Sequence, residues 1–177
     1  MLFGRKPTLS PANRSMPDSI VTPVLHYPDV RAAVEWLCGA FDFRERLRIA
    51  NHRSQLEIGN ACVVIAQGAQ VYPAYGWPGH CIMVRIADVD AHHRHSVDCG
   101  AHVVSRPATY PYGERQYTVL DIGGHSWTFS QTEADVDPMS WGGVDVDREG
   151  RAKSVSRGKV GTSRERLFEF ANVEPFA

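Results

Sequence analysis

The chain has 177 residues, 43% of them hydrophobic, and a formal net charge of −1. This length predicts one domain or two very small ones with a real core. The near-neutral charge excludes a general electrostatic bias toward nucleic acid or an anionic membrane surface. No apolar run approaches the roughly 18 residues that a membrane-spanning helix needs, so we expect neither a membrane nor a nucleic-acid partner.

Residues 1–17 contain Arg5, Lys6 and Arg14, no acid and no apolar stretch of the kind found in a secretory signal. They are predicted to form a flexible leader. The cysteines form no CxxC pair and sit in periodic apolar segments, which is typical of reduced, buried thiols in a cytoplasmic protein. These cysteines are Cys38, Cys62, Cys81 and Cys99.

The first structured segment follows the leader. Residues 19–27 form an apolar run that contains Pro23, which predicts a strand that tolerates a missing hydrogen-bond donor. Asp29 is the expected N-cap of a helix, because apolar residues then recur at helical spacing as far as Phe41. A tight turn at Gly59-Asn60 is predicted before the last strand of this segment. The three strands after the helix are expected over residues 45–49, 55–58 and 61–66.

Residues 80–131 predict the same order of elements. An apolar run over residues 80–86 precedes a helix that Asp88 caps and that Cys99-Gly100 stops. A Pro/Tyr/Gly loop covers residues 107–113, and Gly123-Gly124 lies in the final turn. The strands of this half are expected over residues 102–105, 114–121 and 125–130.

The two halves correspond at several points in the same order. Asp29-Val30 matches Asp88-Val89, Cys38-Gly39-Ala40 matches Cys99-Gly100-Ala101, and a turn containing glycine precedes each closing strand. We interpret this as a duplicated β-α-β-β-β module, over residues 18–67 and 80–131, with a linker between them. The alternative is that unrelated small α+β units share capping acids and terminal glycines.

These residues also carry a family resemblance. The run from Pro23 to Val30 resembles the first module of the vicinal-oxygen-chelate superfamily, which includes glyoxalase I, bleomycin-resistance proteins and extradiol dioxygenases. The second half resembles a glyoxalase/bleomycin-resistance-like subfamily more closely, and the resemblance covers residues 18–143. Asp42 stands where that family commonly has glycine. The supporting segments of the second half are residues 88–92, 112–117, 124–131, 135–138 and 141–143.

The resemblance implies an α+β fold in which two tandem βαβββ modules curl around a cleft. Metal-dependent relatives place four His or Glu side chains in that cleft, on the first and last strand of each module. In this sequence, the corresponding positions hold Thr22, Val64, Cys81 and Thr128. None is a carboxylate or an imidazole, so we expect no metal and no other cofactor.

Alternation along the strands assigns side chains to faces. We expect Trp127 and Phe129 to lie under the helices, and the small polar residues between them to face the cleft. A helix is likewise expected to cover the apolar row Ile82, Val84 and Ile86. The residues that alternate with this row, Cys81, Met83 and Arg85, then face the cleft. Aromatic residues on loops would rim this opening. The candidate ligand-binding residues are His26, Val64, Trp77, Cys81, Met83, Arg85, Tyr112, Ser126 and Thr128.

Two points stay open in the sequence, and a third concerns the histidines of the second helix. His26, His80 and Cys81 together would offer a divergent zinc site, but no fourth ligand appears. The face on which Arg115, Tyr117 and Val119 lie depends on the strand register. A third group, His92, His93 and His95, is predicted to form a solvated helix face rather than a metal site.

The functional reading follows from the fold and these positions. We expect a protein that binds a small organic molecule without the usual metal, as a cytoplasmic homodimer. One alternative is an enzyme of the same superfamily, a lyase, isomerase or dioxygenase with a divergent site. Another is a module that binds a partner through its charged tail, residues 144–177. In this tail, the capping box at residues 162–165 predicts a short helix, and full disorder is the rival prediction.

Overall fold

The computed structural model describes residues 13–69, 79–144, 146–147 and 150–151. The chain divides into two compact units, Met1–Asp137 and Pro138–Ala177. In the second unit, a 3-10 helix spans Pro138–Trp141, and the Gly143 amide donates to the Pro138 carbonyl at 2.7 Å. The helix predicted after residue 162 lies outside the described residues, and within them no helix is long and apolar enough to span a membrane.

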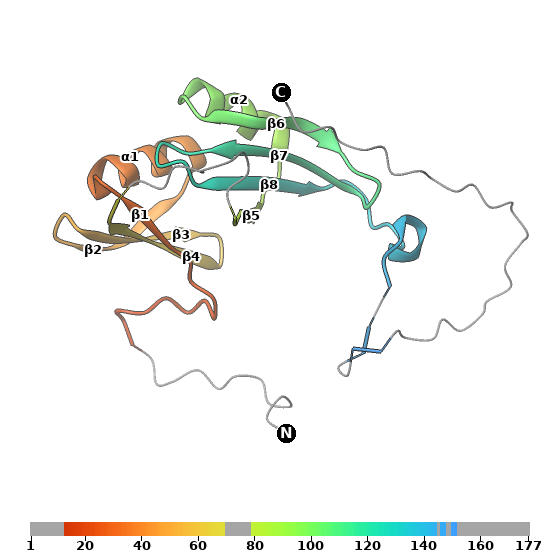
Figure 1. Cartoon of the computed structure of the whole chain (residues 1–177), viewed down its shortest axis with the longest axis horizontal. Helices are drawn as coiled ribbons and strands as arrows, with labels where there is room; N and C mark the ends of the chain where they lie inside the picture. The colour runs from red at the N-terminus through yellow and green to blue at the C-terminus, as the bar shows by residue number, and fades with distance from the viewer. Residues whose placement is uncertain (1–12, 70–78, 145, 148–149, 152–177) are drawn as a thin grey trace, which may run out of the picture. The chain divides into compact units, whose positions relative to one another are not determined.

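The described residues of the first unit contain the predicted module twice (Figure 1). Each copy is a strand, a helix and three further strands. The first copy consists of β1 (Val24–Tyr27), α1 (Val30–Phe41), β2 (Arg44–Ile49), β3 (Arg53–Ile58) and β4 (Ala61–Gln67). The second consists of β5 (Ile82–Arg85), α2 (Val89–Asp98), β6 (His102–Thr109), β7 (Glu114–Leu120) and β8 (Ser126–Thr132).

Each module forms one mixed sheet of four strands in the described residues. The strand orders are β1-β4-β3-β2 and β5-β8-β7-β6. The first strand of each module pairs in parallel with the last, and the remaining pairs are antiparallel. This shared topology confirms the predicted α+β fold of two tandem βαβββ modules.

The helices begin and end where the sequence predicts. The Asp29 side chain accepts from the Ala32 amide at 3.0 Å, and Asp88 caps Ala91 in the same way at 2.9 Å. Helix α1 ends at Asp42, whose φ of 59° is a left-handed conformation that glycine usually adopts. This left-handed conformation explains why glycine is common at this position in the family that the sequence resembles.

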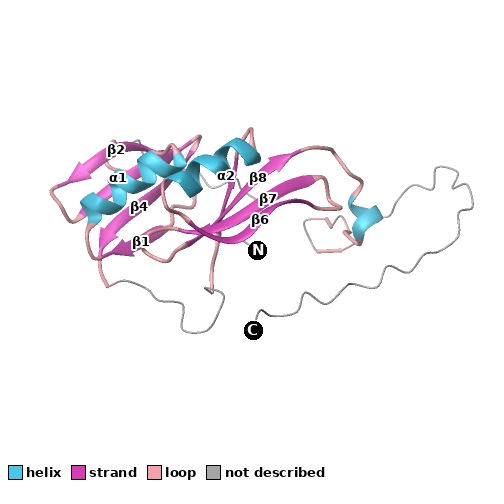
Figure 2. Cartoon of the chain, turned by 90° about the horizontal axis from the view of Figure 1, so that it is seen from above, coloured by secondary structure: helices cyan, strands magenta, loops and turns pink. Residues whose placement is uncertain are grey.

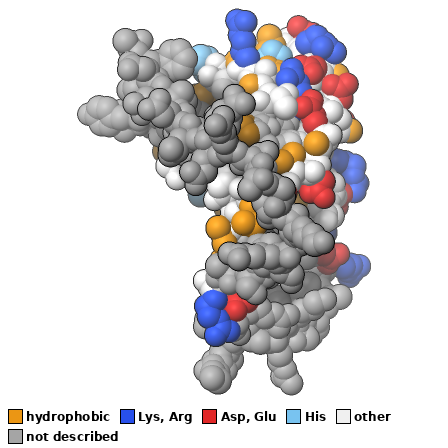
Figure 3. All heavy atoms as spheres, turned by 90° about the vertical axis from the view of Figure 1, so that its right-hand side faces the viewer, with side chains coloured by type: hydrophobic (Ala, Val, Ile, Leu, Met, Phe, Trp, Pro, Cys, Tyr) orange, Lys and Arg blue, Asp and Glu red, His pale blue; other side chains and the backbone are white. Residues whose placement is uncertain are grey.

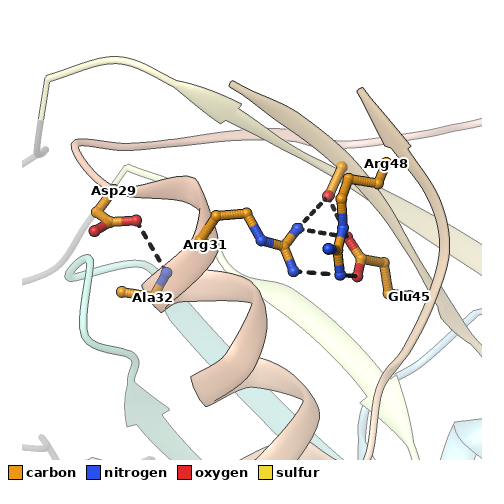
Figure 4. A network of polar contacts seen from close by, with 6 residues as sticks. Asp29, Arg31, Ala32, Glu45 and Arg48 are labelled. Carbon is orange, nitrogen blue, oxygen red and sulfur yellow. Dashed lines mark hydrogen bonds and ion pairs between the residues drawn. The ribbon is translucent and has the colours of Figure 1, made fainter. Parts of the chain in front are cut away.

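A charged network ties α1 to the edge strand of the first sheet (Figure 4). The Arg31 guanidinium donates to Glu45 at 2.6 Å, and Arg48 donates to the other oxygen of the same carboxylate at 2.5 Å. Ser54, on β3, donates to Glu45 as well, at 2.5 Å. These hydrogen bonds, from Arg48 first and then Arg31, hold the pKa of Glu45 well below its ordinary value.

The two modules share one hydrophobic core. Helices α1 and α2 lie next to each other (Figure 2), and the Trp36 indole donates to the Cys99 carbonyl at 2.9 Å. The Phe41 ring, at the end of α1, packs against Trp127 and Phe129 of β8 at centroid distances of 5.7 and 4.9 Å. Both of these β8 residues are fully buried, as predicted.

Two strand boundaries differ from the prediction by more than two residues. Strand β1 begins at Val24 rather than at residue 19, just after Pro23, which lacks a backbone donor. Strand β6 runs on through Pro107 to Thr109, although the prediction ended it at residue 105. It is the outer strand of its sheet, where a missing N–H does not break a ladder, and register shifts absorb the irregularity.

Candidate ligand-binding site

The outer face of the second sheet, opposite α2, carries most of the predicted site. The pairing register of β7 resolves a question that the sequence left open, namely on which face of this strand Arg115 lies. Arg115 pairs with Asp90 of α2 at 2.7 Å, so the residues that alternate with Arg115 point to the outer face. Met83 lies beside Thr128, and Arg85 beside Ser130, in the parallel pairing of β5 with β8.

Uncharged side chains lie at the centre of this face. The Cys81 thiol and the Thr128 hydroxyl are 3.1 Å apart, and the Thr128 and Thr118 hydroxyls are 2.8 Å apart. Each hydroxyl group both donates and accepts, so the orientation of the hydrogens is free to adapt to a bound molecule. This trio joins the residue that precedes β5 to β8 and β7.

A second hydrogen-bond chain ends on a carboxylate. The Gln116 amide donates to the Ser130 hydroxyl at 3.0 Å, and this hydroxyl donates to Glu114 at 2.5 Å. Arg85 donates to the Thr132 hydroxyl at 2.8 Å, which donates to the other oxygen of Glu114 at 2.6 Å. The hydroxyls of Ser130 and Thr132, with Arg85 as a weaker cause, lower the pKa of Glu114 below its ordinary value.

Aromatic side chains lie at the end of the same face. Tyr110 and Tyr112 stack with their ring centroids 5.3 Å apart and their planes 14° apart. The Tyr112 hydroxyl donates to the Gln116 carbonyl oxygen at 3.0 Å. Burial raises the pKa of Tyr112, and Tyr110 and Glu114 add to this effect, so the phenol stays protonated at neutral pH and remains a donor.

A hollow of about 410 Å³ adjoins this face at the junction of the modules. Residues 82–85 of β5 line one side, and residues 58–63 of the β3–β4 hairpin line another. Val21 and Met83, which are 77% and 61% exposed, give the hollow an apolar border. Its volume is in the range of small-molecule pockets.

The remaining candidates do not join this group, and Ser126, although it alternates with Thr128 along β8, does not line a cleft as predicted. His26 and Val64 belong to the outer face of the first sheet, where His26 is exposed and Val64 is buried. Ser126 is buried, and within the described residues its hydroxyl has no hydrogen-bond partner. Trp77 lies outside the described residues. The structure therefore brings together Cys81, Met83, Arg85, Tyr112 and Thr128.

The residues at the family's metal positions do not fit a divalent ion. Thr22 bonds Ser19, Val64 offers no ligand atom, and Cys81 and Thr128 bond each other. Within the described residues, no group of three or more His, Cys, Asp or Glu side chains is placed to hold a metal. This includes the divergent set of His26, His80 and Cys81.

The prediction of a solvated histidine face on α2 was wrong for His92 and His93, which are half-buried, whereas His95 is exposed. The His92 ring lies 4.2 Å from the Phe129 ring between centroids, and its Nδ1 contacts the Tyr117 hydroxyl. His93 packs edge-on against Tyr117 at 5.1 Å, and His95 contacts the Gly39 carbonyl at 2.7 Å. Because α2 is mostly hydrophilic, its sequence did not indicate the face that packs on β7, β8 and α1.

Several residues of the outer face were not among the predicted candidates. They all alternate along β7 or β8, so the register of these two strands would have identified them. That register was undetermined because both faces of β7 carry polar side chains. The additional residues are Glu114, Gln116, Thr118 and Thr132, whereas alternation along the last strand already placed Ser130 on the cleft face.

The fold matches known structures. TioX from Micromonospora sp. ML1 is 33% identical, with a TM-score of 0.54, over 64% of this chain and 98% of that chain. A glyoxalase/bleomycin resistance protein/dioxygenase family enzyme from Burkholderia phytofirmans PsJN is 16% identical, with a TM-score of 0.54 over 63% of this chain and 96% of that chain. Fosfomycin resistance protein FosX from Mesorhizobium loti is 22% identical, with a TM-score of 0.51, over 66% and 93%.

No protein-family model and no curated protein sequence matches the chain. The structural matches, together with the identity to TioX over nearly all of that protein, define its class. The chain belongs to the glyoxalase/bleomycin-resistance/dioxygenase family of the vicinal-oxygen-chelate superfamily.

Proposed function

We propose that this protein binds a small organic molecule, without a divalent metal, on the outer face of its second sheet and in the adjoining hollow. The observation that carries this proposal is the chemistry at the family's metal positions. There, Cys81 and Thr128 form an uncharged hydrogen-bonded group with Thr118, where metal-dependent relatives would need imidazole or carboxylate.

The site favours a ligand with one apolar and one polar end. Met83 and Val21 border the hollow with apolar surface, and the stacked Tyr110 and Tyr112 offer a flat aromatic one. Arg85 supplies a cationic donor for a carbonyl or anionic group at the polar end. Its bond to Thr132 fixes the guanidinium next to the pocket.

Sequestration or delivery of the ligand fits this site better than catalysis does. The one carboxylate in the hydrogen-bonded chain, Glu114, has a pKa below its ordinary value because hydroxyl donors and Arg85 stabilise its charge. A general base that works near neutral pH needs a raised pKa instead. The free thiols of all four cysteines are consistent with a reducing, cytoplasmic location.

Metal analysis separates this proposal from the enzyme alternative. Protein purified without chelator or histidine tag should contain far less than one equivalent of any divalent ion by mass spectrometry. A stoichiometric ion that disappears when Cys81→Ser or His80→Gln is introduced would instead support a divergent metal enzyme.

Binding is tested with Arg85→Met, which keeps most of the side-chain volume but removes the charged donors. A compound identified by native mass spectrometry or by a thermal-shift screen should bind roughly ten-fold or more weakly to this variant, the loss expected for a charge-assisted hydrogen bond. Arg44→Met, on β2 of the first sheet, is the matched control and should bind normally. Equal affinities for wild type and Arg85→Met would remove Arg85 from the site.

We also propose that the chain works as a homodimer. The exposed apolar side chains Ile20, Val21, Val24 and Met83 support this proposal, because a second copy would cover them. Sedimentation equilibrium should give twice the chain mass at micromolar concentration. Replacing Met83 by Glu should weaken the association, whereas a monomeric mass for the wild type would contradict it.

A further inference from the structure

The outer face of the first sheet is contacted by a segment of the chain itself. Residues 13–19 lie on the side of this sheet that faces away from α1 (Figure 1). The buried Gln55 amide donates to the Ser15 carbonyl at 2.8 Å, and the Arg46 guanidinium donates to the Arg14 carbonyl at 3.3 Å. Two backbone carbonyls of the segment are thus bound by side chains of β2 and β3.

The two side chains that receive the segment also hold each other. Arg46 donates to the Gln55 side-chain oxygen, and its Nε lies 3.4 Å from Glu57. Because Arg46 occupies the oxygen of Gln55, the amide nitrogen of Gln55 is turned toward Ser15. Without the segment this donor, in a residue only 5% exposed in the intact protein, would lose its partner within the chain.

Among the residues that the structure describes, the second sheet has no equivalent arrangement. Thr118 occupies the place on β7 that Gln55 has on β3, since each pairs with the central residue of the last strand, Thr128 or Val64. Thr118 bonds Thr128 within its own sheet. The duplicated modules therefore differ in what their outer faces hold.

A hollow of about 330 Å³ lies between the segment and the sheet. Pro17, Asp18 and Ser19 line one side, and Arg46, Glu57 and Cys62 are among the residues of the sheet that line the other. Cys62 is 2% exposed, and burial raises the pKa of its thiol. This thiol is a natural reporter of whether the segment is in place.

We infer that residues 14–19 are a built-in strap that covers the β2–β3 part of the outer face of the first sheet and leaves the second sheet as the ligand-binding face. The strap is bound through its backbone carbonyls, so its attachment depends on the donors of Gln55 and Arg46. This inference goes beyond the proposed function and does not depend on which ligand the second face binds.

Thiol labelling tests the strap. Full-length protein and a variant that starts at residue 20 are treated with iodoacetamide, and each cysteine is quantified by peptide mass spectrometry. Removal of the strap should increase the labelling rate of Cys62 by about ten-fold or more, as a buried thiol becomes accessible. The rates of Cys38 and Cys81 should not change.

The second test uses full-length Gln55→Leu, which can be measured even if the shortened chain does not fold. It keeps the side-chain volume but removes the donor, so Cys62 should label several-fold faster. Gln116→Leu, at a buried glutamine on the outer face of the second sheet, is the matched control and should leave Cys62 unchanged. An unchanged rate for Cys62 in a folded strap variant, or equal acceleration of all four thiols, would overturn the inference.

Discussion

Asp121 is a single carboxylate on which both modules depend. It lies in the turn before β8 and is 7% exposed. The Tyr27 hydroxyl of the first module donates to it at 2.6 Å, and the Trp127 indole donates to the same oxygen at 2.8 Å. The backbone amides of Gly123 and His125 bind its other oxygen at 2.8 and 3.0 Å.

We predict that Asp121→Ala destabilises the protein by about 3–5 kcal/mol, because it leaves several buried donors without an acceptor. Tyr27→Phe removes only one of these bonds and should cost about 1–3 kcal/mol. Urea unfolding followed by circular dichroism measures both values. If Asp121→Ala costs no more than Tyr27→Phe, the carboxylate does not organise the turn as the geometry indicates.

His92 makes stability depend on pH. Burial lowers its pKa below the ordinary value near 6.5, since it packs on Phe129 and its Nε2 has no hydrogen-bond partner within the described residues. The unfolded chain therefore binds a proton more readily than the folded one below about pH 6.5. The stabilising contribution of the neutral imidazole is complete above that pH and is lost as pH falls toward the lowered pKa.

We predict that the free energy of unfolding falls between pH 7.5 and pH 5.5, and that His92→Gln reduces this fall. Urea titrations at several pH values measure the slope for both proteins. The other histidines are common to wild type and variant, so the difference isolates His92. Parallel pH profiles would show that His92 does not stay neutral in the folded protein.

At the scale of a single element, alternation along β8 predicts the face on which a side chain lies but not its burial, because Ser126 and Ser130 on the outer face are only 1% exposed. Trp127 and Phe129 are both 0% exposed, and Thr128 between them lies on the outer face. We predict a cost of about 3–5 kcal/mol for Trp127→Ala, the range for truncating a large core side chain. Thr128→Ala should cost about 1–2 kcal/mol, because its half-buried hydroxyl makes two hydrogen-bond contacts, with Cys81 and Thr118. Chemical denaturation shows which of the two variants loses more stability, and a larger loss for Thr128→Ala would contradict the assignment of faces.

The elements that the sequence predicted well are those with a strong local signal. Asp29 and Asp88 cap the helices as expected, and the turn at Gly59 separates β3 from β4. The errors fall where tertiary position overrides the local pattern. Pro107 ends a strand in most contexts, but here it lies in an outer strand that does not need its donor.

The site was predicted only in part for a related reason. The positions of Met83 and Arg85 follow from an apolar row that alternates with them, so their face could be assigned from the sequence. Glu114 and Gln116 lie on a strand with polar residues on both faces, and only the ladder to β8 fixes their side. On the face seen in Figure 3, basic and acidic side chains intermingle, and the net charge of −1 gives no further indication of a partner.

At the scale of the whole chain, the two modules depend on a common core. The buried cluster draws on both sheets and both helices, and Phe41 of the first module packs between side chains of the second. Trp36 and Tyr27 add hydrogen bonds across the junction, to the Cys99 carbonyl and to Asp121. A module alone would expose this surface, and domains of roughly 60 residues are marginally stable in any case.

We therefore predict that the two modules unfold together and that neither is stable alone. Urea unfolding of the full chain should give coincident transitions by tryptophan fluorescence and circular dichroism, as a two-state unit does. A fragment of residues 79–137 should show no cooperative transition, because Trp127 and Phe129 lose their partner Phe41. Adding a fragment of residues 13–69 in excess should restore the transition if the shared core is what is missing. A sigmoidal transition for the isolated second fragment would mean that the modules are independent domains.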